Sequence, residues 1–125
     1  MLAKALDIYL IGLLVIGCAA VAPAQQSGQD AVQTLSGEIM DDLCAKTKSH
    51  EQMMDQMKSM TRDPGVCTKK CVQLGAHYVL YDRQKDAVYR IENPDKAEPF
   101  AGKAVRISGT LKKNKLKIDT ITASK

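Results

Sequence analysis

Residues 77–91 read HYVLYDRQKDAVYRI, and residues 103–122 read KAVRISGTLKKNKLKIDTIT. Each stretch holds two runs rich in β-branched and aromatic or aliphatic residues, separated by a charged turn, which is typical of a β-hairpin. Ile121 breaks the alternation of the last run, so we expect a bulge or twist there. Between the hairpins, residues 93–95 (NPD) predict a short helix that Pro99 ends within about one turn. The C-terminal half therefore predicts four strands and one helical turn.

Upstream of these hairpins, Leu35, Gly37 and Ile39 alternate with polar residues and predict a further strand. Residues 43–75 change to a helical period and predict an insert with helices at about 50–60 and 66–74. The order of elements favours a mainly β fold, namely a five-stranded OB-like barrel with a helical insert between its first two strands. An open five-stranded sheet with helices on one face is the competing topology.

The N-terminal segment has the pattern of a signal peptide. Lys4 precedes an apolar run over residues 8–21, and Ala22-Pro23-Ala24 has the small-x-small form of a cleavage site. We therefore expect a signal peptide at 1–24, a flexible leader at 25–33 and a single domain at 34–125, in a periplasmic or extracellular protein. Two alternatives stay open: acylation of Cys18, which would tether the chain to a membrane, and an uncleaved helix.

The net charge of +4 is unevenly distributed. From Lys103 to the C-terminus, seven basic residues stand against Asp119 alone. These lysines suit a solvated strand edge that resists edge-to-edge pairing, and the alternative is an anionic partner such as a membrane surface. Because aromatic residues are only 4% of the chain, a stacking surface for nucleic acid is not expected. The partner itself is not identified by the sequence.

Three cysteines remain once Cys18 leaves with the signal peptide. Cys67 and Cys71 are four residues apart, so a helix places both on one side, and a bridge between them would be strained. In an oxidising compartment the sequence favours a disulfide from Cys44 to Cys67 or Cys71, with the third thiol left over. Thiol–disulfide exchange is an alternative, and it requires an acidic, exposed thiol.

A metal site is the other alternative for the same cysteines. Cys44, His50, Cys67 and Cys71 make a set of three sulfurs and one nitrogen, which suits tetrahedral zinc, and soft sulfur ligands also suit Cu(I). Thioethers follow His50 in the predicted helix, although the favoured interpretation is that they fill its apolar side, at Met53, Met54, Met57 and Met60. His77 is interpreted as a partly buried strand residue.

Three segments carry a resemblance to a known family: SGEIMDDLCA from Ser36, CTKKCVQLGAHYVLYD from Cys67, and FAGKAVRISGTL from Phe100. Together they resemble a family of small exported bacterial proteins of unknown function with an OB-like core. The resemblance implies an exported barrel with paired cysteines and no established activity. His77, Pro99 and the methionine-rich helix depart from the family pattern.

The sequence contains no phosphate-binding glycine loop, no Gly-x-Ser-x-Gly elbow and no His-Glu-x-x-His motif. Adjacent acids at Asp41 and Asp42 are interpreted as a solvated turn. We therefore expect a protein that is not an enzyme and needs no cofactor, an exported binding module with a disulfide-stabilised insert. A periplasmic zinc- or copper-binding protein and a thiol–disulfide exchange protein are the alternatives.

Overall fold

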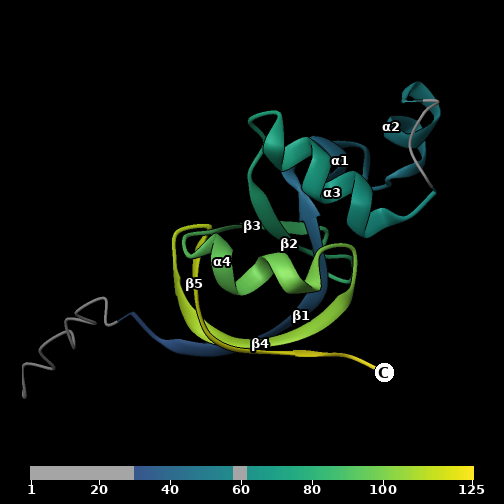
Figure 1. Ribbon diagram of the computed structural model, residues 1–125. Helices are drawn as coiled ribbons and strands as arrows, with labels where there is room; N and C mark the ends of the chain where they lie inside the picture. The colour runs from purple at the N-terminus through teal and green to yellow at the C-terminus, as the bar shows by residue number, and fades with distance from the viewer. Residues whose placement is uncertain (1–29, 58–61) are drawn as a thin grey trace, which may run out of the picture.

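The computed structural model describes residues 30–57 and 62–125 (Figure 1). The predicted signal peptide, Cys18, most of the predicted leader and Met60 lie outside the described residues. Within these ranges the chain forms five strands: β1 (Val32–Asp41), β2 (Tyr78–Asp82), β3 (Ala87–Ile91), β4 (Ala104–Lys112) and β5 (Lys115–Ala123). None of the helices in this part of the chain has the length and apolar character needed to span a bilayer.

The strands form one mixed sheet in the order β1-β2-β3-β5-β4, and β4 pairs back with β1 so that the sheet closes. All neighbours are antiparallel except β3 and β5, which are parallel over two residue pairs. The predicted hairpins are present as β2–β3 and β4–β5. The prediction of a mainly β fold is thus confirmed.

The predicted bulge lies in the β4–β5 hairpin. Ser108 pairs with Thr120 and Gly109 pairs with Ile118, so Asp119 has no partner on β4. Asp119 is thus the extra residue of the bulge. It lies two positions before Ile121, and it shifts the Ile121 side chain out of the alternation set by Leu116 and Ile118. The broken alternation in the sequence therefore has a local cause in the register of this hairpin.

In the described part of the chain, five short helical segments accompany the sheet: α1 (Asp42–Thr47), α2 (Glu51–Gln56), α3 (Pro64–Gln73), α4 (Pro94–Ala97) and the 3-10 helix η1 (Glu98–Phe100). Figure 1 shows α1, α2 and α3 gathered at one end of the sheet, while α4 crosses the side of the barrel. The region between β1 and β2 is therefore a helical insert, as the change of period predicted.

The boundaries of several elements differ from the predicted ones. The helix predicted at 50–60 ends at Gln56, and the segment before it forms a separate helix, α1. The helical turn predicted after residue 93 is present as α4, which ends at Ala97 after about one turn, and Pro99 lies in the 3-10 helix η1 that follows. β1 begins at Val32, inside the range predicted as a leader, because residues 32 and 33 pair with Thr110 and Gly109 of β4.

Two groups of buried side chains form the interior. The barrel core contains Leu35, Ile39, Leu80, Ile107, Leu116 and neighbouring apolar residues. The second group, here called the insert core, lies between the sheet and the helices and contains Met40, Cys44, Ala45, Cys67, Cys71, Val79 and Tyr81. All five residues of β2 are buried because one face packs into the barrel and the other under the insert.

Candidate metal centre

The first cysteine of the insert is held by the junction between β1 and α1. Asp41 ends the strand and caps the helix, and its Oδ1 accepts hydrogen bonds from the backbone amides of Leu43 (3.1 Å) and Cys44 (2.9 Å). The chain turns sharply at this cap. The Cys44 side chain therefore lies in the insert core, and the residue is 1% exposed. A local hydrogen bond therefore positions this thiol.

The other two cysteines lie on α3. This helix begins with Asp63 as its cap and Pro64 in its first turn, and the Asp63 carboxylate accepts from the amides of Gly65 (2.7 Å) and Val66 (3.2 Å). Cys67 and Cys71 follow at a spacing of four and are both buried in the insert core. The prediction that a helix places them on one side is confirmed.

The three thiols form one cluster, here called the thiol cluster. The Sγ atoms of Cys44, Cys67 and Cys71 all lie within 4.8 Å of one another, and those of Cys44 and Cys67 are 3.8 Å apart. A disulfide requires about 2.05 Å. All three cysteines are free, so the predicted disulfide and its paired cysteines are not formed in this structure. The sulfurs meet at contact distance because α1, which carries Cys44, and α3, which carries Cys67 and Cys71, converge at one point.

His50 lies beside this cluster at the N-cap of α2. Its Nε2 is 2.7 Å from Oε1 of Glu38, while its buried Nδ1 has no hydrogen-bond partner. The residue is only 7% exposed. Pairing of Nε2–H with the carboxylate leaves the lone pair on Nδ1, which is the form of imidazole that binds a metal.

Asp41 is the site residue that the sequence interpretation missed. It is fully buried rather than part of a solvated turn, and its Oδ2 has no hydrogen-bond partner. Asp41, Cys44 and His50 form a second group of possible ligand atoms, also within 4.8 Å of one another. The two groups share Cys44 and do not merge into a single group at that limit. Burial of an acid at this strand end depends on the insert covering it, which no local pattern reveals.

The environment keeps the free thiols protonated. Burial raises the pKa of Cys44, Cys67 and Cys71, and the nearby Asp41 charge raises it further. For Cys71 the pKa rises to about 12. A thiol of this kind is a poor nucleophile near neutral pH, whereas a bound cation would favour the thiolate.

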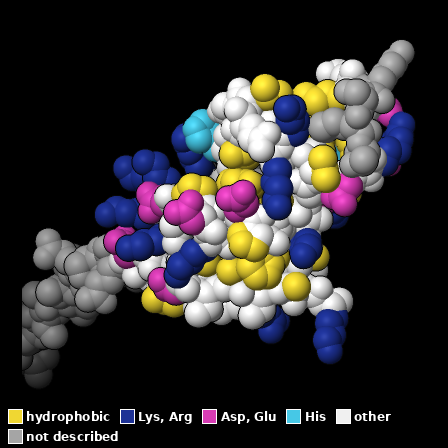
Figure 2. Space-filling model, viewed as in Figure 1, with side chains coloured by type: hydrophobic (Ala, Val, Ile, Leu, Met, Phe, Trp, Pro, Cys, Tyr) yellow, Lys and Arg dark blue, Asp and Glu magenta, His cyan; other side chains and the backbone are white. Residues whose placement is uncertain are grey.

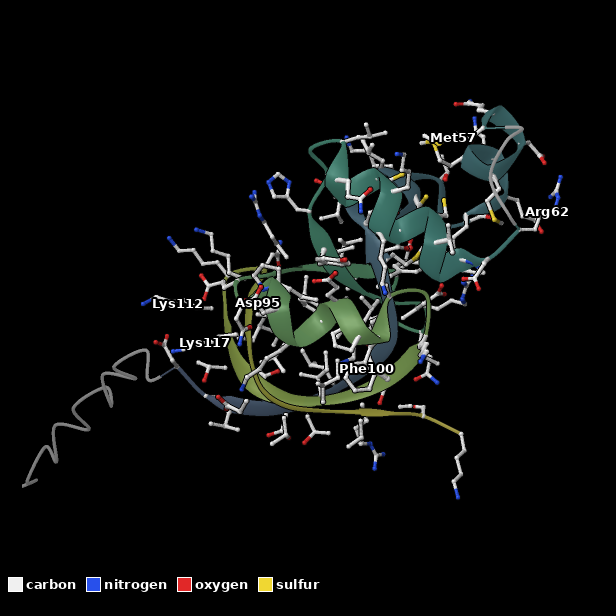
Figure 3. All side chains as sticks on the ribbon, viewed as in Figure 1. Met57, Arg62, Asp95, Phe100, Lys112 and Lys117 are labelled. Carbon is white, nitrogen blue, oxygen red and sulfur yellow. The ribbon has the colours of Figure 1, made fainter. Side chains whose placement is uncertain are left out.

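Methionine side chains lie in and against the insert core. Met40 is buried in the insert core, and Met53 and Met54 of α2 pack against it while partly exposed. Figure 3 labels Met57 at the end of α2, where it is also partly exposed. The interpretation that the described methionines fill an apolar side therefore holds for Met53 and Met54.

His77 takes no part in either group of ligand atoms. It precedes β2, is exposed rather than partly buried, and its Nδ1 lies 3.2 Å from Oδ2 of Asp42. The Asp42 carboxylate also accepts from the His77 backbone amide at 3.1 Å. Asp42 follows β1 and His77 precedes β2, so these hydrogen bonds link the two ends of the helical insert and have a structural role.

Comparison with known proteins found no matching family model, no matching curated protein and no matching solved structure. The site is therefore interpreted from its own chemistry.

Proposed function

We propose that this protein is an exported, non-enzymatic module that binds one thiophilic metal ion, Zn²⁺ or Cu⁺, through Cys44, Cys67, Cys71 and His50. The observation that carries the proposal is the convergence of three buried thiols, of which Cys44 also lies within 4.8 Å of a ring nitrogen of His50, a residue whose buried Nδ1 has no partner. Buried polar groups almost always have hydrogen-bond partners, so an unpartnered one needs an explanation. A metal ion supplies one.

The spacing of the sulfurs supports this proposal. In a tetrahedral zinc site with Zn–S bonds of about 2.3 Å, two sulfurs lie about 3.8 Å apart. Cys44 and Cys67 have this separation. The third thiol, Cys71, is near enough to complete the sulfur face with a small side-chain adjustment.

The fourth ligand comes from the second group. His50 is favoured because Glu38 holds its Nε2, in the carboxylate–histidine arrangement common around protein metals. Asp41 Oδ2 is the competing fourth donor, since it is also buried and without a partner. A carboxylate ligand would favour Zn²⁺, whereas three thiolates in a core that also contains methionine suit Cu⁺.

Burial supports a binding role over a catalytic one. The donors are covered by α1, α3 and the sheet, so a bound ion would be surrounded by protein ligands. Closed zinc sites of this composition are structural, while catalytic sites keep an open position for water or substrate. The same reasoning supports a non-enzymatic module.

The proposal includes a fold and a location. The closed strand order with one parallel pair supports assignment to the OB-like barrels. The signal-peptide pattern at residues 1–24 supports export. The resemblance to small exported bacterial proteins with an OB-like core implies the same fold and the same location.

A structural disulfide is the second candidate for the same residues. Cys44 and Cys67 are the pair that would form it, because 3.8 Å between their sulfurs leaves a short approach to bonding distance. Loss of two hydrogens to a periplasmic oxidant would then replace metal binding with a covalent link between α1 and α3. Cys71 would remain the free thiol.

The deciding experiment measures metal content and thiol number together. The protein would be exported by its own signal peptide and purified anaerobically. We expect one equivalent of bound metal, and three thiols that react with an alkylating agent after denaturation. Cys71→Ser should lose the metal. The control Ala97→Ser makes a similar change at a buried position in the barrel core and should keep it. One reactive thiol and no metal would instead establish the disulfide module.

A further inference from the structure

A basic end lies on the barrel away from the helical insert. It consists of five exposed residues brought together by the β4–β5 turn and the end of β3, namely Arg90, Lys112, Lys113, Lys115 and Lys117. The parallel pairing of Arg90 with Lys115 joins the two strand ends. Figure 3 labels Lys112 and Lys117 on this side, opposite α2. The four lysines line a shallow cleft of about 500 Å³.

The charge of this end is only partly compensated. Two carboxylates, Asp30 and Glu92, also line the cleft, and Lys112 Nζ lies 3.7 Å from Asp30 Oδ1. Among residues 30–57 and 62–125, the other three lysines make no ion pair. Figure 2 shows basic side chains gathered here with acidic ones among them. The end therefore keeps an excess of positive charge exposed to solvent.

The chain enters the domain at this same end. Asp30 is the first described residue, and Val32 at the start of β1 pairs with Thr110 of β4. In the sequence, eight residues separate Asp30 from the apolar run that ends at Val21. Eight residues reach at most about 28 Å. A membrane that held the apolar run would therefore lie within reach of the basic end.

From this juxtaposition we infer that the basic end docks on the anionic lipid surface of the membrane. Positive charges on a protein surface are attracted by anionic headgroups, and this attraction acts within about a Debye length. In this orientation the thiol cluster faces away from the lipid, because the helical insert lies at the opposite end (Figure 1). The inference does not depend on whether the cluster binds a metal.

A nucleic acid fits this surface less well. The described aromatic residues are all buried or half-buried, at Tyr78, Tyr81, Tyr89 and Phe100. Single-stranded nucleic acid is bound through exposed rings on which bases stack, together with basic residues. The basic end offers charge without such rings, which favours a surface of phosphate headgroups.

The test compares two kinds of vesicle. The exported protein would be sedimented with phosphatidylcholine vesicles and with vesicles that also contain phosphatidylglycerol, at low and high salt. We expect preferential binding to the anionic vesicles at low salt and its loss at high salt. Each lysine at the surface contributes about fivefold. Replacement of Lys112, Lys113, Lys115 and Lys117 by Gln should therefore weaken the preference at least tenfold.

A matched variant tests whether position matters or only net charge. Replacement of Lys46, Lys69, Lys70 and Lys125 by Gln makes the same charge change at exposed positions elsewhere, and it should leave the preference within twofold. Equal losses in the two variants would overturn the inference. So would an absence of preference in the unmodified protein, or tighter binding to duplex DNA or to an anionic polysaccharide than to the anionic vesicles.

Discussion

Single side chains in the candidate metal centre have roles that depend on one or two hydrogen bonds. Glu38 is the clearest case, because it contacts none of the thiols yet holds the imidazole that would complete their ligand set. Glu38 contacts His50 through one carboxylate oxygen, and Arg83 lies 3.7 Å from the other. Glu38 is therefore a positioning residue for His50.

Removal of this carboxylate should weaken metal binding without removing a ligand. For Glu38→Ala we expect Zn²⁺ affinity to fall about 10- to 100-fold, because the imidazole loses its fixed orientation and tautomer. Glu38→Gln should lose less, since its amide oxygen still accepts from Nε2–H. The measurement is competition with a chromophoric chelator. Glu51→Ala changes an exposed acid on α2 and serves as the control; equal affinities for Glu38→Ala and this control would contradict the assigned role.

At the scale of elements, the position of α3 on the barrel depends on a close backbone approach. Gly102 has φ +73°, and a Cβ there would lie closer than 3.0 Å to backbone atoms of Pro64 and Gly65 at the start of α3. Its amide also donates to the Ile39 carbonyl at 2.8 Å. Only glycine fits between the helix and β1, so this contact places Cys67 and Cys71 over the sheet.

Substitution of this glycine should destabilise the fold and separate the cysteines of α3 from Cys44. We expect Gly102→Ala to lower the free energy of unfolding by about 2–4 kcal/mol, from overpacking added to backbone strain. Gly75→Ala is a matched control, because Gly75 also has positive φ but open space around its missing Cβ; it should cost about 1 kcal/mol. Urea denaturation measures both. Similar losses in the two variants would mean that strain alone, and not the contact with α3, sets the cost.

At the scale of the whole molecule, the insert core adds buried thiols to a small barrel, and this links stability to pH. In the unfolded chain the thiols ionise near their ordinary pKa of 9.0, while burial raises the pKa of all three in the fold. The unfolded state therefore loses protons first as pH rises. The stability contributed by neutral thiols is fully present below about pH 9 and is lost as pH rises toward the folded pKa.

The metal-free, reduced protein should accordingly lose stability in alkali. We expect the free energy of unfolding to be nearly constant from pH 7 to 8 and to fall above pH 9, by up to about 1.4 kcal/mol per pH unit for each thiol. Urea denaturation at several pH values up to 9.5 provides the measurement. Cys71→Ala removes one titrating group and should give a shallower slope. A flat profile, or an unchanged slope in the variant, would contradict this linkage.

Much of this protein is determined by local sequence. Alternation of apolar residues specified the strands, the spacing of Cys67 and Cys71 specified a shared helical face, and the helical period specified α3, although this helix begins at Pro64 rather than at residue 66. These signals are readable because strand and helix periods involve neighbours within a few residues. The short helix α1 escaped prediction because six residues carry too little periodic signal.

Only the tertiary structure determined which residues far apart in the sequence lie next to one another. Asp41 reads as a solvated acid until the insert folds over it, and Cys44 reads as the disulfide partner of Cys67 or Cys71 until the three thiols are placed as free side chains, with Cys44 and Cys67 3.8 Å apart. Closure of the sheet likewise puts the basic β4–β5 turn next to the point where the chain enters the domain. Burial and long-range pairing depend on residues far apart in the chain, so no local pattern contains them.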